Sequence, residues 1–327
     1  MISRRRVMGL LAATTLPIRA SQARSTTWSM STEYPATSMS GEGLRFFADA
    51  LARESGGRIA VNVSFDAALK SADVPTAISD HRVMGADAFA GGLGQFDPLF
   101  LLSSLPFLAA TQADARRLYA AARVAYAERL AQEGQVLLFA TPWPPSGLWA
   151  KKPIIAPADL AGLAIRTYDA TSAQVLAASG AHPANLSFTD TMPKLVDGSI
   201  AAVLSSGDGG AGRRLWEHLR HFTEINYAVP LSLAIVNAGY FKALPDDLHT
   251  AVDRAAEATE ARQWQLLETR LAANYARMAE NGVTITKADA LTPELRALFA
   301  RSARDAIDAW KKQVGPERAR LLATVEK

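Results

Sequence analysis

The chain has 327 residues, 49% of them hydrophobic and 20% charged, so it is long enough to bury the cores of two domains. It has no cysteine, which excludes disulfides, thiol nucleophiles and thiolate metal sites. The formal net charge is +3, but residues 1–23 hold four arginines and no acid, so the remainder carries 35 − 4 = 31 basic and 32 acidic residues, a net charge of −1. This remainder lacks the clustered basic face of a nucleic-acid binder.

Residues 1–23 have the pattern of an export signal. Arginines at positions 4–6 precede an apolar stretch over 7–16, and Ser-Gln-Ala at 21–23 fits a cleavage site. The apolar stretch is too short to span a bilayer as a mature anchor. The arginine cluster also fits the twin-arginine export motif, so Tat-like and Sec export both stay open. We expect an exported, soluble, periplasmic protein.

The first half of the chain alternates between strand and helix patterns. Strands are predicted over residues 25–30, 59–65, 86–90 and 136–140, and helices over 43–54, 73–79 and 112–133. A loop over 141–148 follows, and we expect it to cross into a second lobe.

The second half begins with the pattern of a parallel sheet. The apolar runs at 163–165, 184–188 and 201–204 alternate with helix patterns, which is typical of parallel strands. Two apolar runs flanking Pro230, within 222–236, are expected to return to the first lobe. Residues 246–280 contain no proline or glycine and predict one long helix, followed by an edge strand over 282–285 and a helix over 293–314.

These patterns predict an α/β protein with two lobes. We expect mixed, mostly parallel sheets with helices on both faces and a long hinge-spanning helix. The first lobe is predicted to contain residues 24–144 and about 229–260, and the second residues 145–228 and about 280–327. A ligand cleft should lie between the lobes, a common place for small-molecule sites.

Arg166 is the strongest candidate for a binding residue. It ends the apolar run at 163–165, so a buried strand delivers its guanidinium to the carboxyl end of the sheet, where open α/β sheets bind ligands. A guanidinium can hold a carboxylate with two parallel hydrogen bonds. The alternative is an ordinary surface arginine at the end of a strand.

A glycine-rich segment, Gly207–Gly212, fits the dinucleotide pattern G-x-G-x-x-G and precedes a predicted helix over 213–219. It makes an exported oxidoreductase the alternative function. The predicted helix is short and no acidic residue clearly ends the following strand, so a loop whose N–H groups face an anion is the other interpretation.

Other catalytic patterns are absent from the sequence. There is no H-E-x-x-H and no G-x-S-x-G, and among five histidines only His218 and His221 stand at helical spacing. We therefore expect no enzymatic activity, no metal site and no cofactor.

Several segments resemble the solute-binding proteins of TRAP transporters. They are Asp-Leu-x-Gly-Leu-x-Ile-Arg at 159–166, Gly-Ala-x-Pro at 180–183, Phe188, Gly-Gly-Arg-Ile at 56–59, Leu-Pro-Phe at 105–107, and Asn237 with Leu-Pro at 244–245. The resemblance covers most of the chain. It implies a two-lobed periplasmic binding protein that closes on an organic acid, with Arg166 as the carboxylate clamp, and delivers it to a membrane permease. A receptor that feeds a sensor kinase is a further alternative, and we expect a monomer.

The chain also departs from the family pattern. A second arginine, which relatives that bind sialic or dicarboxylic acids place in the crossover loop, is replaced here by Ser146, and the ligand-binding asparagine is matched by Ser205. One guanidinium then predicts a monocarboxylate with an uncharged, aromatic or otherwise apolar body. The expected ligand-binding residues are Arg166, Ser205, Tyr168, Phe89, Trp143, Trp149, Ser206, Asp208, Tyr34 and Tyr227.

Overall fold

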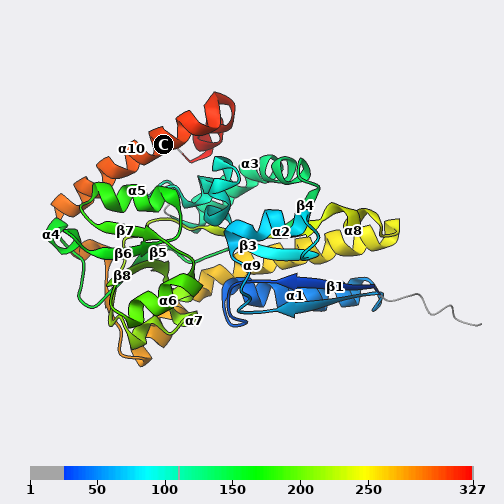
Figure 1. Cartoon of the computed structure of the whole chain (residues 1–327), viewed down its shortest axis with the longest axis horizontal. Coiled ribbons are helices and arrows are strands. Elements are labelled where there is room, and N and C mark those ends of the chain that lie inside the picture. Colours follow the sequence, from blue (N-terminus) through cyan, green and yellow to red (C-terminus); the bar gives the residue numbers. More distant parts are fainter. Residues whose placement is uncertain (1–25, 110, 326–327) are drawn as a thin grey trace, which may run out of the picture.

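The computed structural model describes residues 26–109 and 111–325, so the expected export signal lies outside the described residues. Two lobes lie side by side, each built around one β-sheet with helices against it (Figure 1). This arrangement confirms the two-lobed α/β fold expected from the sequence. None of the helices in these two ranges is long and apolar enough to cross a membrane.

The first lobe is built on a five-stranded sheet in the order β2-β1-β3-β10-β4. Its strands are β1 (Thr26–Ser31), β2 (Ile59–Ser64), β3 (Gly85–Phe89), β4 (Gln135–Pro142) and β10 (Leu231–Asn237). Strands β1, β2 and β3 are parallel, whereas β10 is antiparallel to both of its neighbours. The sheet is therefore mixed. Its antiparallel strand, β10, comes from the second half of the chain and lies between β3 and β4.

Helices cover this sheet through apolar stripes. In α1 (Met39–Glu54), Leu44, Phe47 and Leu51 recur at helical spacing and are fully buried with the sheet residues. Burying each such side chain contributes about 1.5–3 kcal/mol. The remaining helical segments of this lobe are α2 (Val74–Ser79), α3 (Gln112–Ala131), α8 (Ala238–Lys242), η1 (Ser71–Asp73), η2 (Ala90–Gln95) and η3 (Pro98–Ser104).

The second lobe is built on a six-stranded sheet in the order β11-β9-β5-β8-β6-β7. Its strands are β5 (Ser146–Ala150), β6 (Ala164–Thr167), β7 (His182–Asn185), β8 (Ala202–Ser206), β9 (His221–Thr223) and β11 (Thr284–Thr286). Strands β6, β7 and β8 are parallel, as the alternating pattern predicts, and β5 is antiparallel to β8. Around them lie α4 (Pro157–Leu160), α5 (Ala170–Ala178), α6 (Phe188–Val196), α7 (Gly207–Gly212), η4 (Leu215–Glu217) and η5 (Ala288–Ala290).

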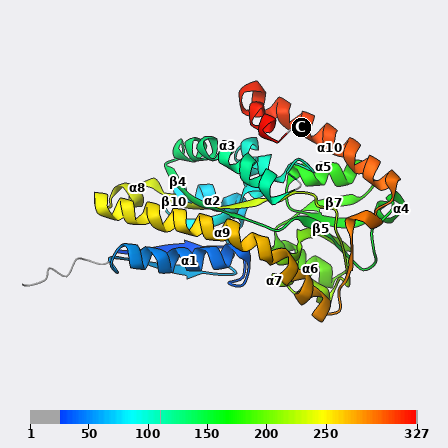
Figure 2. The ribbon, with the colours of Figure 1, turned by 180° about the vertical axis from the view of Figure 1, so that it is seen from behind.

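Four segments pass between the lobes. Strand β4 ends at Pro142 and β5 begins at Ser146, so the first crossover has only three residues, and the second joins β9 to β10. The 35-residue helix α9 (Asp246–Glu280) runs from α8 to α7 (Figure 2). Helix α10 (Pro293–Ala319) begins against α4 and α5, and η6 (Arg320–Thr324) after it packs on α3 of the first lobe. The long helix therefore spans the hinge as expected.

Three local predictions are wrong. Of the two runs that flank Pro230, only the second returns to the first lobe, as β10, because β9 pairs with β5 and β11 in the second sheet. Most of the loop predicted over 141–148 belongs to strands β4 and β5, because its residues pair in both sheets. The α-helix predicted over 213–219 is also wrong: only the short 3-10 helix η4 forms there, the α-helix is the glycine segment α7 itself, and Arg214 between them has a left-handed backbone (φ 53°). Ser206 caps α7 by accepting a hydrogen bond from the Gly209 N–H at 3.1 Å, which starts the helix earlier than composition suggests.

Candidate functional site

Arg166 is held between two strands of the second sheet. It lies in β6, opposite Val203 of β8 and Ala184 of β7. Its Nε donates to the Leu186 carbonyl at 2.8 Å and its Nη1 to the Leu204 carbonyl at 3.1 Å. These two bonds fix the plane of the guanidinium. Nη2 makes no hydrogen bond with the described residues and remains free for a ligand.

The Arg166 guanidinium is buried without an opposite charge. The side chain is 4% exposed, and no carboxylate of residues 26–109 or 111–325 forms an ion pair with it. Burial lowers the pKa of Arg166, while the ionisable side chains of Tyr34 and Glu33 act in the opposite direction. The Phe188 ring lies 4.4 Å below the guanidinium carbon and supplies part of the missing negative potential. An unpaired buried cation is costly, so the site favours an anionic partner.

A cavity lies directly in front of Arg166. Its space, about 320 Å³ with the part open to solvent, receives side chains from both lobes and from the first two crossovers. We call it the small cavity; its lining residues are Tyr34, Phe89, Trp143, Ser146, Arg166, Tyr168, Phe188, Ser205, Ser206, Gly209 and Pro230. The structure thus brings together Arg166, Ser205, Ser206, Tyr168, Phe89, Trp143 and Tyr34 from the set expected to bind the ligand.

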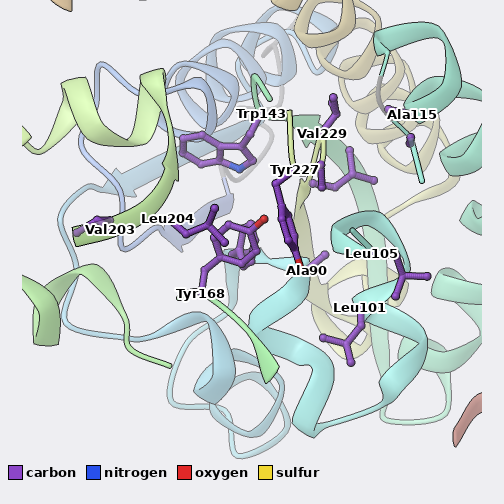
Figure 3. Close-up of a cluster of buried hydrophobic side chains, with 14 of the residues drawn as sticks. Ala90, Leu101, Leu105, Ala115, Trp143, Tyr168, Val203, Leu204, Tyr227 and Val229 are labelled. Atoms are coloured by element: carbon purple, nitrogen blue, oxygen red, sulfur yellow. The ribbon is translucent and has the colours of Figure 1, made fainter. Parts of the chain in front are cut away.

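Aromatic rings form the walls of the small cavity. The rings of Tyr34 and Trp143 lie 4.7 Å apart, and those of Phe89 and Tyr168 lie 5.1 Å apart edge to face. Figure 3 shows Trp143 and Tyr168 among the buried side chains of this region. The Trp143 indole N–H donates to Ser232 Oγ at 3.0 Å, which fixes its ring. Such walls offer large apolar contact to a ring-shaped ligand.

Hydroxyl groups supply the polar part of the lining. Ser146 Oγ and Tyr168 Oη are buried and make no well-formed hydrogen bond with the described residues, although the Ser146 hydroxyl is close enough to offset part of the increase that burial causes in the Tyr168 pKa. Ser206 Oγ is used in capping α7, whereas Gly209 leaves room for the Ser205 hydroxyl, since a Cβ there would lie 2.6 Å from Ser205 Oγ. Unpaired hydroxyls beside a free guanidinium suit a small polar anion.

Three expected site residues do not line the small cavity. Trp149 is fully buried in the second lobe, where its indole N–H donates to the Ser206 carbonyl at 3.3 Å. Tyr227 is buried behind Tyr168, with ring centroids 6.2 Å apart (Figure 3). Asp208 points to helix α9, where its carboxylate accepts from Arg270 Nε and, at 3.2 Å, from Asn274. Their positions beside strand ends did not predict the direction of their side chains.

Four lining residues were not in the expected set. Phe188 belongs to the family pattern and Ser146 replaces a family arginine, so the resemblance marked both positions. Gly209 belongs to the glycine-rich segment that was considered for its backbone N–H groups, and Pro230, between two predicted strands, has no polar side chain.

A second guanidinium, that of Arg213, lies near the small cavity but is already engaged. Its carbon is 6.0 Å from the Phe188 ring centre. Its Nη1 forms an ion pair with Asp66 at 3.0 Å, and its Nη2 donates to the Glu33 carbonyl. Lys151 and Lys152, which follow β5, are exposed. Arg166 is therefore the cation that faces the cavity.

A larger cavity adjoins the small one and shares Tyr34, Phe89, Arg166 and Tyr168 with it. Its space, about 1150 Å³ with the part open to solvent, adds both polar and apolar residues from the two lobes. Residues of this large cavity include Glu33, Lys70, Ser71, Asn185, Ser187, Asp190 and Gln313. The two spaces together form the interlobe cleft.

The glycine-rich segment does not form a dinucleotide loop. Gly207–Gly212 is the helix α7, and its glycines are packing positions: a Cβ on Gly210 would lie 2.3 Å from the Trp149 ring. Since this helix is closed against a tryptophan, its glycines are explained without a bound phosphate.

Comparison with known proteins places these features in a family. A model described as "Bacterial extracellular solute-binding protein, family 7" matches residues 30–313. The solved structure of DctP7, a Bordetella pertussis extracytoplasmic solute receptor binding pyroglutamic acid, is 29% identical, covers 93% of this chain and 100% of its own, and gives a TM-score of 0.88. No match was found among curated proteins.

Further structures show the same fold. A marine metagenome TRAP solute-binding protein specific for pyroglutamate is 26% identical over 92% of this chain and 99% of its own, with a TM-score of 0.86. A TRAP periplasmic solute-binding protein from Sulfitobacter sp. NAS-14.1 with bound β-D-galacturonate is 16% identical over 92% of this chain and 99% of its own, with a TM-score of 0.82.

Proposed function

This chain belongs to the bacterial extracellular solute-binding protein family 7, a family of receptors and not of enzymes, and we propose that its ligand is a small organic acid with a single carboxylate held by Arg166. The protein binds this acid outside the cytoplasm and delivers it to a TRAP-type membrane permease. It acts as a monomer whose lobes, with the boundaries expected from the sequence, move as two bodies about the crossovers.

The observation that carries the proposal is the unpaired guanidinium of Arg166. One nitrogen is free, the side chain is buried, and the adjoining space lies between the two lobes. A carboxylate placed there gains a charge-assisted hydrogen bond and neutralises a buried charge. A second carboxylate would find Arg213 already paired with Asp66. Its desolvation would cost several kcal/mol, which disfavours dicarboxylates.

The ring-lined walls of the small cavity favour a compact ring-shaped ligand. Two similar receptors bind pyroglutamate, a five-membered cyclic monocarboxylate. Pyroglutamate is therefore the first candidate, and small aromatic monocarboxylates such as benzoate are the second because of the ring-lined walls.

A thermal-shift screen followed by calorimetry tests this proposal. The acids are pyroglutamate, benzoate and phenylacetate, with succinate and malate as matched dicarboxylates. A ligand that binds only the native state adds about 2.7 kcal/mol of stability at a hundredfold excess over its Kd. We expect this shift with a monocarboxylate and none with a dicarboxylate. Tight binding of succinate or malate with all three monocarboxylates inert would contradict the single-carboxylate proposal.

A further inference from the structure

Glu33 is a buried acid in the interlobe cleft. It follows β1, directly before Tyr34, and only 5% of it is exposed. It lines the large cavity, which shares Tyr34, Phe89, Arg166 and Tyr168 with the small one. Its negative charge raises the pKa of Tyr34, as burial does to a larger extent. It also raises the pKa of Arg166, which burial lowers by more. Glu33 is therefore close to the place where we expect the ligand.

One oxygen of this carboxylate is fixed by the protein. Oε1 accepts hydrogen bonds from the Ser71 N–H, at 3.1 Å, and from the Ser71 hydroxyl. The same hydroxyl accepts from the Phe89 N–H at 2.8 Å, so the carboxylate is tied to a wall of the small cavity. These bonds leave the side chain in one orientation.

The other oxygen is unused. Oε2 makes no hydrogen bond with the described residues, and within these ranges no arginine, lysine or histidine forms an ion pair with the carboxylate. The nearby guanidinium of Arg213 binds the Glu33 backbone carbonyl and Asp66 instead. Because Oε2 is unbonded and faces the large cavity, a donor from the ligand can reach it and form a charge-assisted hydrogen bond.

We propose that Glu33 determines which acids the cleft accepts: its Oε2 takes a hydrogen bond from an N–H or O–H group of the ligand and repels a second carboxylate. This inference rests on the proposed function, because it places the ligand carboxylate at Arg166. The cleft then selects a monocarboxylate that carries a hydrogen-bond donor near its acid group. An acid of the same shape without the donor leaves the oxygen unpaired and binds more weakly.

The replacement Glu33→Gln tests the role of this oxygen. The amide oxygen must face Ser71, whose N–H is a donor, so the amide nitrogen takes the place of Oε2. The variant therefore presents a donor to the cleft where the native protein presents an acceptor. The probes are pyroglutamate and its lactone analogue, 5-oxotetrahydrofuran-2-carboxylate, in which a ring oxygen replaces the N–H.

Calorimetric Kd values for both probes give a preference ratio for each protein. We expect the native protein to prefer pyroglutamate by about tenfold or more, as for a hydrogen bond to a charged group, and Glu33→Gln to lose or reverse this preference. Ser71→Ala is the control: it removes a bond to Oε1 but keeps Oε2, so both Kd values should rise together with the ratio unchanged. The ratio compares folded protein only, so partial destabilisation does not affect it.

The outcomes separate the two proposals. If both probes bind and the ratio is the same in Glu33→Gln as in the native protein, Glu33 has only the structural role of holding Ser71 and Phe89, and the inference is wrong. If neither probe binds the native protein while another class of solute does, the proposed ligand class is wrong, and the inference is overturned with it.

Discussion

Lys70 Nζ lies 2.7 Å from Asp190 Oδ2, and this ion pair joins the first lobe to the second across the large cavity. The hydrogen bond from Lys70 lowers the pKa of Asp190. Because both side chains are about 40% exposed (41% and 39%), the pair contributes little to overall stability. It forms only where the lobes are this close, so it belongs to the closed state of the cleft.

Asp190→Asn should therefore weaken ligand binding slightly without unfolding the protein. We expect an increase in Kd of up to about fivefold, the range for an exposed ion pair, mainly through faster dissociation. The native protein should show the same loss in high salt, where the pair is screened, while the variant responds less. Stopped-flow dissociation at two salt concentrations measures this.

Asp247→Asn is the matched control for that measurement. Asp247 pairs with Arg58 at the surface of the first lobe, and neither residue lines the cleft. Its side chain is exposed, at 57%. Its replacement should leave the dissociation rate unchanged. Equal effects of the two variants would mean that general surface charge, and not lobe closure, is responsible.

Asp208→Ala should lower stability more than it lowers affinity. The carboxylate is 2% exposed and accepts from Met39 N at 2.9 Å, from Arg270 and from Asn274. Its removal leaves the Met39 N–H and Asn274 without their acceptor, while Arg270 keeps Glu42 at 2.9 Å and the Thr37 carbonyl, so we expect a loss of about 1–3 kcal/mol. Urea unfolding measures this loss.

Ser205→Ala is the contrasting variant for Asp208. Its hydroxyl lines the small cavity and makes no hydrogen bond with the described residues, so its loss should barely change the free energy of unfolding. We expect ligand affinity to fall by about two- to tenfold, as for one neutral hydrogen bond. The opposite pattern, with Ser205→Ala unstable and Asp208→Ala stable but unable to bind, would restore Asp208 as a ligand-contacting residue.

The sequence predicted the position of Arg166 because its signal is local: an apolar run ends at an arginine, and the family motif surrounds it. It predicted Asp208 and Trp149 wrongly as lining residues because the end of a strand locates a residue but does not orient its side chain. Trp149 pairs with Val203 and faces the buried side of the sheet, toward Gly210. The helix α7 turns Asp208 toward α9.

The contacts between lobes were not predictable from local patterns. Glu33 and Arg213 meet although 180 residues separate them, and Lys70 and Asp190 meet across 120 residues. Each of these residues lies in a segment whose composition fits an ordinary surface loop or helix. Only the packing of the two lobes brings these residues together, so no local pattern could predict the polar contacts of the cleft.

Asp87 should make stability depend on pH. Burial raises its pKa to about 7, although the hydroxyls of Ser40, Thr32 and Ser232 favour the charged form, and that of Thr32 donates to it at 3.1 Å. Because the folded pKa lies above the ordinary value of 3.8, the native state holds the proton more tightly. Its contribution is full below about pH 4 and is lost as the pH rises through about 7.

The Asp87→Asn variant isolates this contribution. The difference in unfolding free energy between native protein and variant, measured in urea at several pH values, should shift by up to about 4 kcal/mol from pH 4 to pH 8 in the direction that disfavours the native protein at high pH. Glu33, whose charge adds to the increase in the Asp87 pKa, is unchanged in both proteins. A difference that does not vary with pH would show that Asp87 is already charged at pH 4.

Arg166→Lys should remove most of the ligand affinity although the positive charge remains. A lysine ammonium cannot reach the Leu186 and Leu204 carbonyls and also present a planar donor to the cavity, as the guanidinium does. We expect a loss of about 1.5–3 kcal/mol of binding free energy, the range for hydrogen bonds to charged groups, which is roughly a 10- to 150-fold increase in Kd. Titration calorimetry with the best acid from the screen measures this increase in Kd.

The melting temperature of the variant is the control for stability. A lysine has one ammonium group in place of the guanidinium, so the Leu186 and Leu204 carbonyls lose a donor and the variant can be less stable. A variant that is destabilised yet binds with native Kd would show that Arg166 holds the strands together and does not bind the carboxylate.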